Sequence, residues 1–216
     1  LQTVRDAVRS AAQASGRADT AVTLVAVSKT HSAEQVQRAI AAGQRHFGEN
    51  RVQEAAAKFP ALRAATPDLV LHLIGPLQTN KVRQAIALFD VIETLDRPKL
   101  AHALAEEMRH AGRRVPCLVE VNVGDEAQKA GVAVRELPEF LALCRQLDLP
   151  VTGLMCIPPH GEQPAPFFAL LAKLADRHAL PVRSMGMSAD FETAIALGAT
   201  SVRVGTAIFG TRPPAP

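Results

Sequence analysis

The sequence contains no tyrosine and no tryptophan, and it also has no long apolar run. A membrane-spanning helix needs about 18 consecutive apolar residues, and no segment supplies them. Residues 1–16 lack the basic start and the continuous apolar core of a secretory signal. We therefore expect a protein that neither crosses a membrane nor is exported through such a signal.

Cysteine and clustered positive charge are scarce as well. Cys117, Cys144 and Cys156 have no metal-ligand spacing, and three cysteines cannot all pair within one chain. We expect a reducing, cytoplasmic compartment and no metal site. The net charge is only +3, and the basic residues are scattered rather than gathered in a tract. This composition does not favour binding to nucleic acid.

What the sequence does contain is a regular alternation of short apolar runs and helical patterns. Its 216 residues, 48% of them hydrophobic, can form one large core. Short apolar, β-branched runs are typical of buried strands. Eight such runs occur, at about Val22–Ser28, His46–Glu49, Leu69–Ile74, Val91–Leu95, Val115–Val123, Val151–Cys156, Val182–Met185 and Ser201–Gly205.

Helical patterns separate these runs and also precede the first of them. Ser32 and Gln35 form a capping-box pattern, Thr79 and Asp96 are predicted caps, and one helix is expected to end before Pro60. Residues 206–216 have room for one helical turn and a proline-rich tail. The predicted helices are Gln2–Ser15, Ser32–Ala42, Arg51–Phe59, Thr79–Leu88, Asp96–His110, Leu137–Leu147, Phe167–His178 and Ala189–Leu197.

This alternation predicts an α/β protein with a parallel sheet inside and helices outside. Eight units fit a closed (β/α)8 TIM barrel, formed as a single domain over residues 1–216. The helix Gln2–Ser15 could fill the place of the helix that is missing after the eighth strand. An open doubly wound sheet is the alternative, but no G-x-G-x-x-G motif follows a strand.

The first strand run is followed by Lys29. Alternation places Val25, Val27 and Lys29 on one face of the strand. If that face points into the barrel, Lys29 lies at the C-terminal mouth, where β/α barrels hold their ligands. Taken alone, a solvated lysine at a strand end is the commoner case.

The loops after the seventh and eighth strands are the richest in glycine, serine and threonine, at 184–190 and 202–207. These loops form the usual phosphate site of a β/α barrel, where backbone N–H groups at helix starts face the anion. The structural alternative makes Ser188 a helix cap, with Gly186 and Gly205 serving only as turn residues.

Alternation on the last strand turns Arg203 into the barrel, because Val202 and Val204 suit the helix-facing side. A buried arginine needs a partner, which is either a ligand or an internal ion pair, for example with Glu120. His72 is a candidate proton carrier or a structural histidine. Asn50 either contacts a ligand or forms a capping pair with Gln53.

A strand-end lysine, a phosphate cradle and an inward arginine together suit a phosphorylated aldehyde. Pyridoxal 5′-phosphate (PLP) is the obvious candidate, held as a Schiff base on Lys29. Arg203 would then face the pyridine nitrogen. A permanent cation at that position disfavours protonation of the nitrogen and weakens the ring as an electron sink.

Several stretches together resemble the pyridoxal phosphate homeostasis protein family, along nearly the whole chain. They are Val27–Thr30, Phe47–Asn50 with Gln53–Glu54, His72–Lys81, Ser184–Ser188 and Val202–Gly210. The chain departs from the family at Ala189, where an acidic residue is frequent, and in the short loop 158–166.

The resemblance implies a barrel like the N-terminal domain of alanine racemase, with PLP on Lys29. It also implies a role in PLP and vitamin B6 balance, as a carrier without established catalysis. The implied cofactor contacts come from Asn50, Ser184, Ser188, Arg203, Gly205 and Thr206.

The missing tyrosine bears on the choice between a carrier and an enzyme. A racemase needs an acid or base on each face of the substrate carbon, and alanine racemases supply a tyrosine opposite the lysine. We therefore predict a non-catalytic PLP-binding protein and no catalytic residues. The alternatives are a PLP-dependent racemase or decarboxylase that uses His72, and a barrel for another phosphorylated metabolite.

No strongly apolar exposed helix face stands out, which favours a monomer. The candidate protein partners of a PLP carrier are PLP-dependent apoenzymes.

Overall fold

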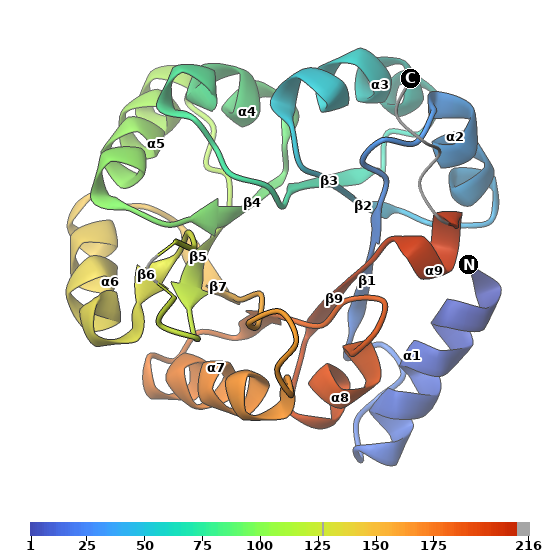
Figure 1. Ribbon diagram of the computed structural model, residues 1–216. Coiled ribbons are helices and arrows are strands. Elements are labelled where there is room, and N and C mark those ends of the chain that lie inside the picture. The colour runs from blue at the N-terminus through green and yellow to red at the C-terminus, as the bar shows by residue number, and fades with distance from the viewer. Residues whose placement is uncertain (127, 211–216) are drawn as a thin grey trace.

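The computed structural model of the chain describes residues 1–126 and 128–210, and these form a closed parallel barrel (Figure 1). The eight predicted strands are confirmed within one or two residues at most ends. β1 pairs with both β2 and β9, and β4 pairs with β5, so the ring closes. Its strands are β1 Thr23–Val27, β2 His46–Glu49, β3 Val70–Leu73, β4 Val91–Leu95, β5 Cys117–Asn122, β7 Val151–Met155, β8 Val182–Ser184 and β9 Ser201–Val204.

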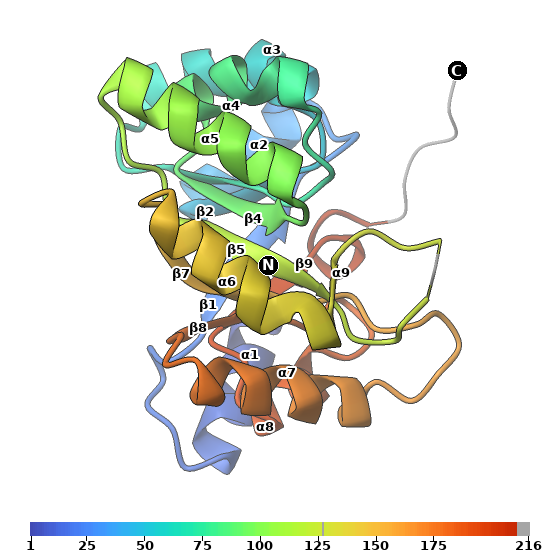
Figure 2. The ribbon, with the colours of Figure 1, turned by 90° about the vertical axis from the view of Figure 1, so that its left-hand side faces the viewer.

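A two-residue strand, β6 (Val132–Ala133), adds to β5 at the edge of the ring. The helices follow one another around the outside, as the side view of α5, α6 and α7 shows (Figure 2). They are α1 Gln2–Ala14, α2 Ala33–Ala41, α3 Val52–Ala65, α4 Val82–Leu88, α5 Pro98–Ala111, α6 Leu137–Gln146, α7 Ala165–Arg177, α8 Phe191–Ala196 and α9 Thr206–Phe209. None of the helices in the described part of the chain has the length and hydrophobicity that a membrane crossing requires.

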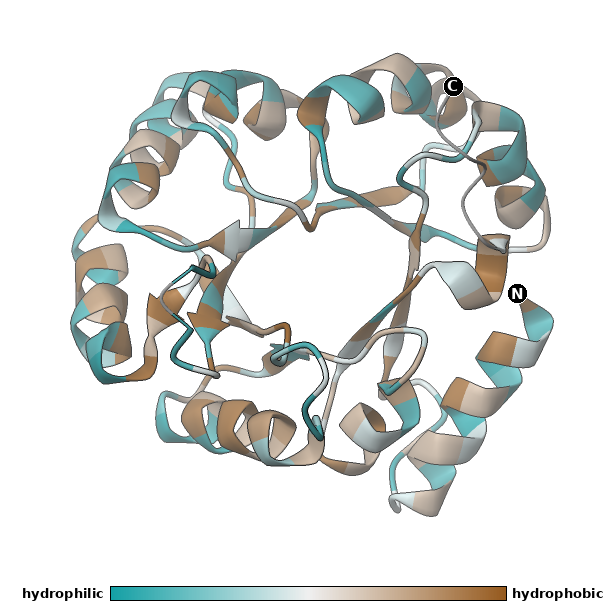
Figure 3. Ribbon diagram, in the orientation of Figure 1, coloured by the Kyte–Doolittle hydropathy of each residue, from teal (hydrophilic) through white to brown (hydrophobic). Residues whose placement is uncertain are grey.

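The main hydrophobic core lies between the strands and the surrounding helices. The strands are largely apolar, whereas the helices combine apolar and polar sides (Figure 3). Ala26, Val202 and Val204 belong to this outer core. Val25 and Val27 are buried but lie outside that cluster, because successive strand residues point to opposite faces. The predicted orientations of β1 and β9 are therefore confirmed.

The helix α1 covers the part of the barrel that lacks a long helix after β9, as predicted. It packs against α8. The Arg5 guanidinium donates to the Ala42 carbonyl oxygen at 2.6 Å, and Arg17, just beyond the helix, donates to the Ala199 carbonyl oxygen at 2.7 Å. These contacts attach the N-terminal segment to the end of α2 and to the loop before β9.

The prediction that the third helix ends before Pro60 was wrong, because α3 continues through Pro60 to Ala65. Phe59 and Leu62 are buried on either side of the proline, so core packing favours continuation of the helix. Pro60 itself is exposed, as is Ala56, whose carbonyl loses its helical partner. Water can satisfy that carbonyl, which lowers the cost of an interior proline.

Helix starts were predicted less well than strands. The capping box of Ser32 and Gln35 is present. Thr79 instead opens a short 3-10 turn, 79–81, without a side-chain cap, and α5 begins after Arg97, which pairs with Asp96. Pro98 supplies the fixed φ that starts this helix without a capping side chain. The one-turn helix expected after the eighth strand is α9, and the proline-rich tail over 211–216 lies outside the described residues.

Candidate functional site

Lys29 lies in a tight turn directly after β1, at the C-terminal mouth of the barrel, and is partly exposed. The next residue, Thr30, has a φ of 65°. A β-branched residue rarely adopts this left-handed conformation, and its strain must be offset by surrounding contacts. The turn therefore has an unusual backbone conformation next to Lys29, the residue that the sequence predicts to bind a ligand.

Side chains of β2 and α3 hold this turn. The Lys58 ammonium donates to the backbone carbonyls of Ser28 and His31, at 2.9 and 3.2 Å, and lies 2.7 Å from a Glu49 carboxylate oxygen. The Thr30 N–H donates to a Glu54 oxygen at 2.5 Å, and Lys58 donates to that same oxygen at 2.9 Å. We call Glu49, Glu54 and Lys58 the turn clamp.

Glu49 is the most deeply buried member of the turn clamp, with no exposed surface. Burial raises the pKa of its carboxyl above the ordinary value, although hydrogen bonds from Lys58 and from the Ser28 hydroxyl, at 2.7 Å, oppose the shift. Sequence reasoning missed the turn clamp. The available signal was a glutamate at the end of the apolar β2 strand, where an unpaired charge would be costly.

The two predicted phosphate loops meet at this mouth. The Ser188 hydroxyl accepts a hydrogen bond from the Gly205 N–H at 3.3 Å. A Cβ atom at Gly205 would lie 3.3 Å from the Cβ of Val27, so the last loop also abuts β1 two residues before Lys29. Beyond Gly205, Phe209 of α9 stacks on His31 with 4.9 Å between ring centroids. Lys29 and both loops are thus brought together.

The structural alternative for Ser188 was wrong in one respect, because the N-cap of α8 is Asp190. An Asp190 oxygen accepts from the Met187 N–H at 2.6 Å, which closes the loop from within. Gly186 has a φ of 94°, and a Cβ there would lie 2.6 Å from the Cβ of Ala194. Only glycine fits this position, so the loop's shape depends on it.

Arg203 points into the barrel and is 4% exposed, as predicted. Its guanidinium donates to the Ser184 hydroxyl at 2.6 Å and to the Cys156 carbonyl oxygen at 2.9 Å. Its ion-pair partner is Glu93, at 3.8 Å, rather than the suggested Glu120. Glu93 was overlooked because it sits within the apolar strand run Val91–Leu95.

His72 is 6% exposed and donates through Nδ1 to a Glu93 oxygen at 2.7 Å. The other Glu93 oxygen accepts from the Ser184 hydroxyl at 2.5 Å. Burial alone would raise the pKa of Glu93, but the hydrogen bond from His72 and the charges of His72 and Arg203 lower it overall. Of the two readings of His72, the structural one fits these contacts.

Asn50 and Glu120 are two further polar residues toward this end of the barrel. Asn50 does not cap α3, whose N-cap is Arg51, and its buried Oδ1 atom accepts no hydrogen bond within the described residues. Burial, followed by repulsion from Asp96, raises the pKa of Glu120 to about 7 against the opposing effect of Arg203. Glu120 can therefore exchange a proton near neutral pH.

Two large apolar side chains are exposed on the described surface, Ile157 at 40% and Met187 at 38%. Both stand in loops that follow barrel strands, after β7 and β8 respectively. They give the polar mouth an apolar rim, which suits a ligand with an aromatic ring.

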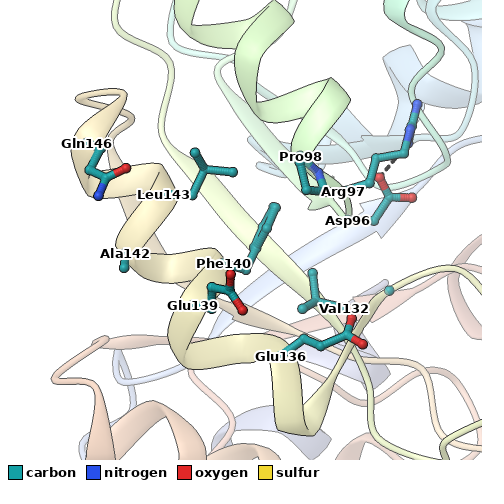
Figure 4. A pocket seen from close by; sticks show the side chains of 11 residues that line it. Asp96, Arg97, Pro98, Val132, Glu136, Glu139, Phe140, Ala142, Leu143 and Gln146 are labelled. Atoms are coloured by element: carbon teal, nitrogen blue, oxygen red, sulfur yellow. Dashed lines mark hydrogen bonds and ion pairs between the residues drawn. The ribbon is translucent and has the colours of Figure 1, made fainter.

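A separate hollow of about 560 Å³ lies outside the barrel, between α6 and the start of α5 (Figure 4). Phe140 and Val132 line its apolar part, and Glu136 and Glu139 stand near its edge. None of the predicted site residues lines this hollow. The predicted ligand-binding residues therefore lie at the barrel mouth and not in this hollow.

The three cysteines do not contribute a nucleophile. All are buried and unpaired by disulfides. Burial raises the pKa of the Cys156 thiol to about 12 and that of Cys144 to about 11, so the reactive thiolate is scarce at neutral pH. The sequence-based choice of Lys29 as the nucleophile therefore has no competitor among the cysteines.

Comparison with solved structures supports the architecture. PipY of Synechococcus elongatus PCC7942, solved with PLP bound, is 40% identical with a TM-score of 0.81, over 94% of this chain and 99% of that one. A Clostridium difficile alanine racemase is only 15% identical, with a TM-score of 0.70 over 90% of this chain and 53% of the racemase. This second likeness shows the barrel fold alone.

Sequence comparison defines the family. The model for the alanine racemase N-terminal domain matches residues 1–213. A pyridoxal phosphate homeostasis protein of Pseudomonas aeruginosa is 45% identical over 213 residues, covering 95% of this chain and 91% of that protein. The protein of the same name from Escherichia coli K12 is 39% identical over 222 residues, covering 98% and 95%. The chain therefore belongs to the pyridoxal phosphate homeostasis protein family, whose barrel is that of the alanine racemase N-terminal domain.

Proposed function

We propose that the chain binds PLP and serves PLP homeostasis, holding the cofactor as a Schiff base on Lys29. One observation carries this proposal: Lys29 and the Ser188–Gly205 loop contact lie at the same end of the barrel, and Arg203 lies inside the barrel below them. The PLP that is bound in PipY, at 40% identity, supports the choice of ligand.

The residues at the mouth fit the chemical groups of PLP. Lys29 supplies the amine that an aldehyde requires. Ser188 and Thr206 bring hydroxyl donors for a phosphate, and the Gly205 N–H, which donates to the Ser188 hydroxyl, orients that hydroxyl at the mouth. Asn50 brings a buried oxygen that lacks a described partner, and Ser184 reaches the site through Arg203. When bound, PLP supplies an electrophilic aldehyde and an aromatic ring that can act as an electron sink.

The site favours holding the cofactor over using it in catalysis. Arg203 places a permanent cation in the barrel, where protonation of a facing pyridine nitrogen would be disfavoured. The chain has no tyrosine, and His72 is committed to Glu93 and His46. We therefore place this protein among non-catalytic carriers that exchange PLP with apoenzymes, as a cytoplasmic monomer.

The alternative function is that of a PLP-dependent racemase or decarboxylase, with Glu120 as its acid or base. Its pKa of about 7 makes it a candidate acid or base near the mouth. The two functions differ in whether substrate amino acids are turned over.

Titration of the purified protein with PLP tests the binding site. We expect a Schiff-base absorption band that saturates at one PLP per chain. Borohydride reduction, proteolysis and mass spectrometry should then place the adduct on Lys29, because this lysine shares the mouth with the phosphate loops. An adduct on another lysine, or no band, would contradict the proposal.

Amino-acid turnover tests the carrier assignment. With PLP bound, racemisation and decarboxylation of the common L- and D-amino acids should stay at background, measured by chiral chromatography and carbon dioxide release. Turnover above background that disappears in Glu120→Gln would establish the enzyme instead. The exposed Glu192 on α8 offers a matched control, Glu192→Gln.

A further inference from the structure

A chain of polar side chains, all buried except the half-buried His46, crosses the barrel beneath the mouth and ends at Arg203. It runs from His46 on β2 through His72 on β3 and Glu93 on β4 to Ser184 on β8. The His46 Nδ1 and His72 Nε2 atoms are 3.1 Å apart. With the Glu93 contacts at 2.7 and 2.5 Å and the Arg203 contact at 2.6 Å, the connection is continuous. We call these four residues the inner chain.

The inner chain also reaches the opposite end of the barrel. A cavity of about 450 Å³ is lined by His46, His72, Glu93 and Ser201, together with residues at the N-terminal ends of several strands. Three residues of the inner chain are nearly inaccessible to solvent, with Ser184 and Glu93 0% exposed and His72 6% exposed. Arg203, which Ser184 contacts, is 4% exposed. Buried polar groups at such depth are retained only when hydrogen-bonded, and here each one is.

The direction of each hydrogen bond follows from the chemistry of Glu93. An ionised carboxylate only accepts, so the Ser184 hydroxyl and the His72 Nδ1–H both donate to it. The Ser184 oxygen is then left as the acceptor for Arg203. The ionised state is consistent with the lowered pKa of Glu93.

These directions fix the guanidinium of Arg203. Ser184 and the Cys156 carbonyl accept from its two terminal nitrogens, and a planar guanidinium held at both ends has one orientation. The Glu93 carboxylate at 3.8 Å balances its charge without contacting it directly. Glu93 thus sets both the position and the effective charge of Arg203.

We propose that Glu93 and His72 are positioning residues for the cofactor ring, acting through Ser184 and Arg203. This inference rests on the proposed function, in which Arg203 faces the pyridine nitrogen. The inner chain orients the guanidinium and partly neutralises it, which tunes the electronics of the bound ring and the rate of PLP release.

The variant Glu93→Gln removes the negative charge and replaces the two carboxylate oxygen acceptors with one oxygen acceptor and one NH2 donor. Ser184 and His72 then cannot both donate to the side chain. We expect the PLP dissociation constant to rise about tenfold or more, as for loss of a charged hydrogen bond, and the Schiff-base absorption maximum to shift. Glu106→Gln, on the exposed side of α5, is the matched control and should leave both values unchanged.

Two further comparisons keep the proposal testable if Glu93→Gln folds poorly. Ser184→Ala removes the bridge without unbalancing charge and should give the same spectral shift. In His72→Asn, the amide nitrogen can replace Nδ1 as donor to Glu93, whereas in His72→Gln it falls near Nε2. We expect near-normal spectra for His72→Asn and altered spectra for His72→Gln.

A readout without PLP completes the test. In the unliganded protein, imidazole ¹⁵N shifts should show His72 protonated at Nδ1, and Glu93→Gln should change them. If the wild type forms no Schiff base, the proposed function fails. If the wild type binds PLP, but folded Glu93→Gln and Ser184→Ala keep its spectrum and dissociation constant, the positioning role alone is overturned.

Discussion

We expect Lys29→Ala to abolish the Schiff-base absorption band of the PLP-treated protein, and borohydride to leave no PLP adduct at position 29. The substitution removes the reactive amine, and alanine cannot react with the aldehyde. PLP is expected to remain bound weakly, through the phosphate loops and Arg203, with the spectrum of the free aldehyde. Absorbance titration and intact-protein mass spectrometry measure both effects.

The variant should fold normally, because Lys29 is partly exposed and belongs to no core cluster. Far-UV circular dichroism should match that of the wild type, because no hydrophobic core residue is lost. Lys29→Arg keeps the charge without a reactive amine and should show the same spectral loss. Lys173→Ala, on the exposed side of α7, is the control. A persistent band in Lys29→Ala would place the Schiff base elsewhere.

The barrel could be predicted from the sequence because its strands are local patterns. Apolar β-branched runs mark the strands, and their alternation with helices leaves few topologies. The inward direction of Arg203 followed from Val202 and Val204 on either side of it. The predicted end of the third helix at Pro60 was wrong because proline's effect on a helix was judged from the local sequence alone. The burial of Phe59 and Leu62, which favours the longer helix, depends on the tertiary structure.

The supporting residues of the site could not be found in this way. Glu93 and Ser184 are 91 positions apart in the sequence but share a 2.5 Å hydrogen bond. The sequence alternation turns Arg203 inward, where it needs a partner, but both β4 and β5 carry an inward carboxylate. Which one lies within reach depends on the closure and stagger of the barrel. Glu120 was therefore a reasonable candidate, and only the fold distinguishes it from Glu93.

The turn clamp leads to the second large effect, which is expected in Lys58→Met. The Lys58 side chain is 10% exposed and its partner Glu49 is 0% exposed. Removal of one partner from a buried ion pair typically costs 3–5 kcal/mol. Glu49 can take up a proton here, because burial already raises its pKa, so we expect a loss of about 2–4 kcal/mol at neutral pH.

The loss should depend on pH with a definite sign. Without Lys58, the pKa of buried Glu49 rises further above its unfolded value of about 4.3. An acid whose pKa is raised in the folded state binds its proton more tightly there, so stability falls as the pH rises above the unfolded pKa. Lys58→Met should therefore be closer to wild type at pH 5 than at pH 8. Urea unfolding at both pH values measures the difference.

The double variant Glu49→Gln with Lys58→Met separates the buried charge from the support of the turn. It removes the uncompensated carboxylate, so much of the stability at pH 8 should return. The carbonyls of Ser28 and His31 still lack their Lys58 donor, so the turn that carries Lys29 should stay loosened and PLP affinity should stay low. Recovery of stability without recovery of PLP binding would show that the clamp shapes the cofactor turn. Wild-type PLP affinity in both variants would show that Lys29 needs no such support.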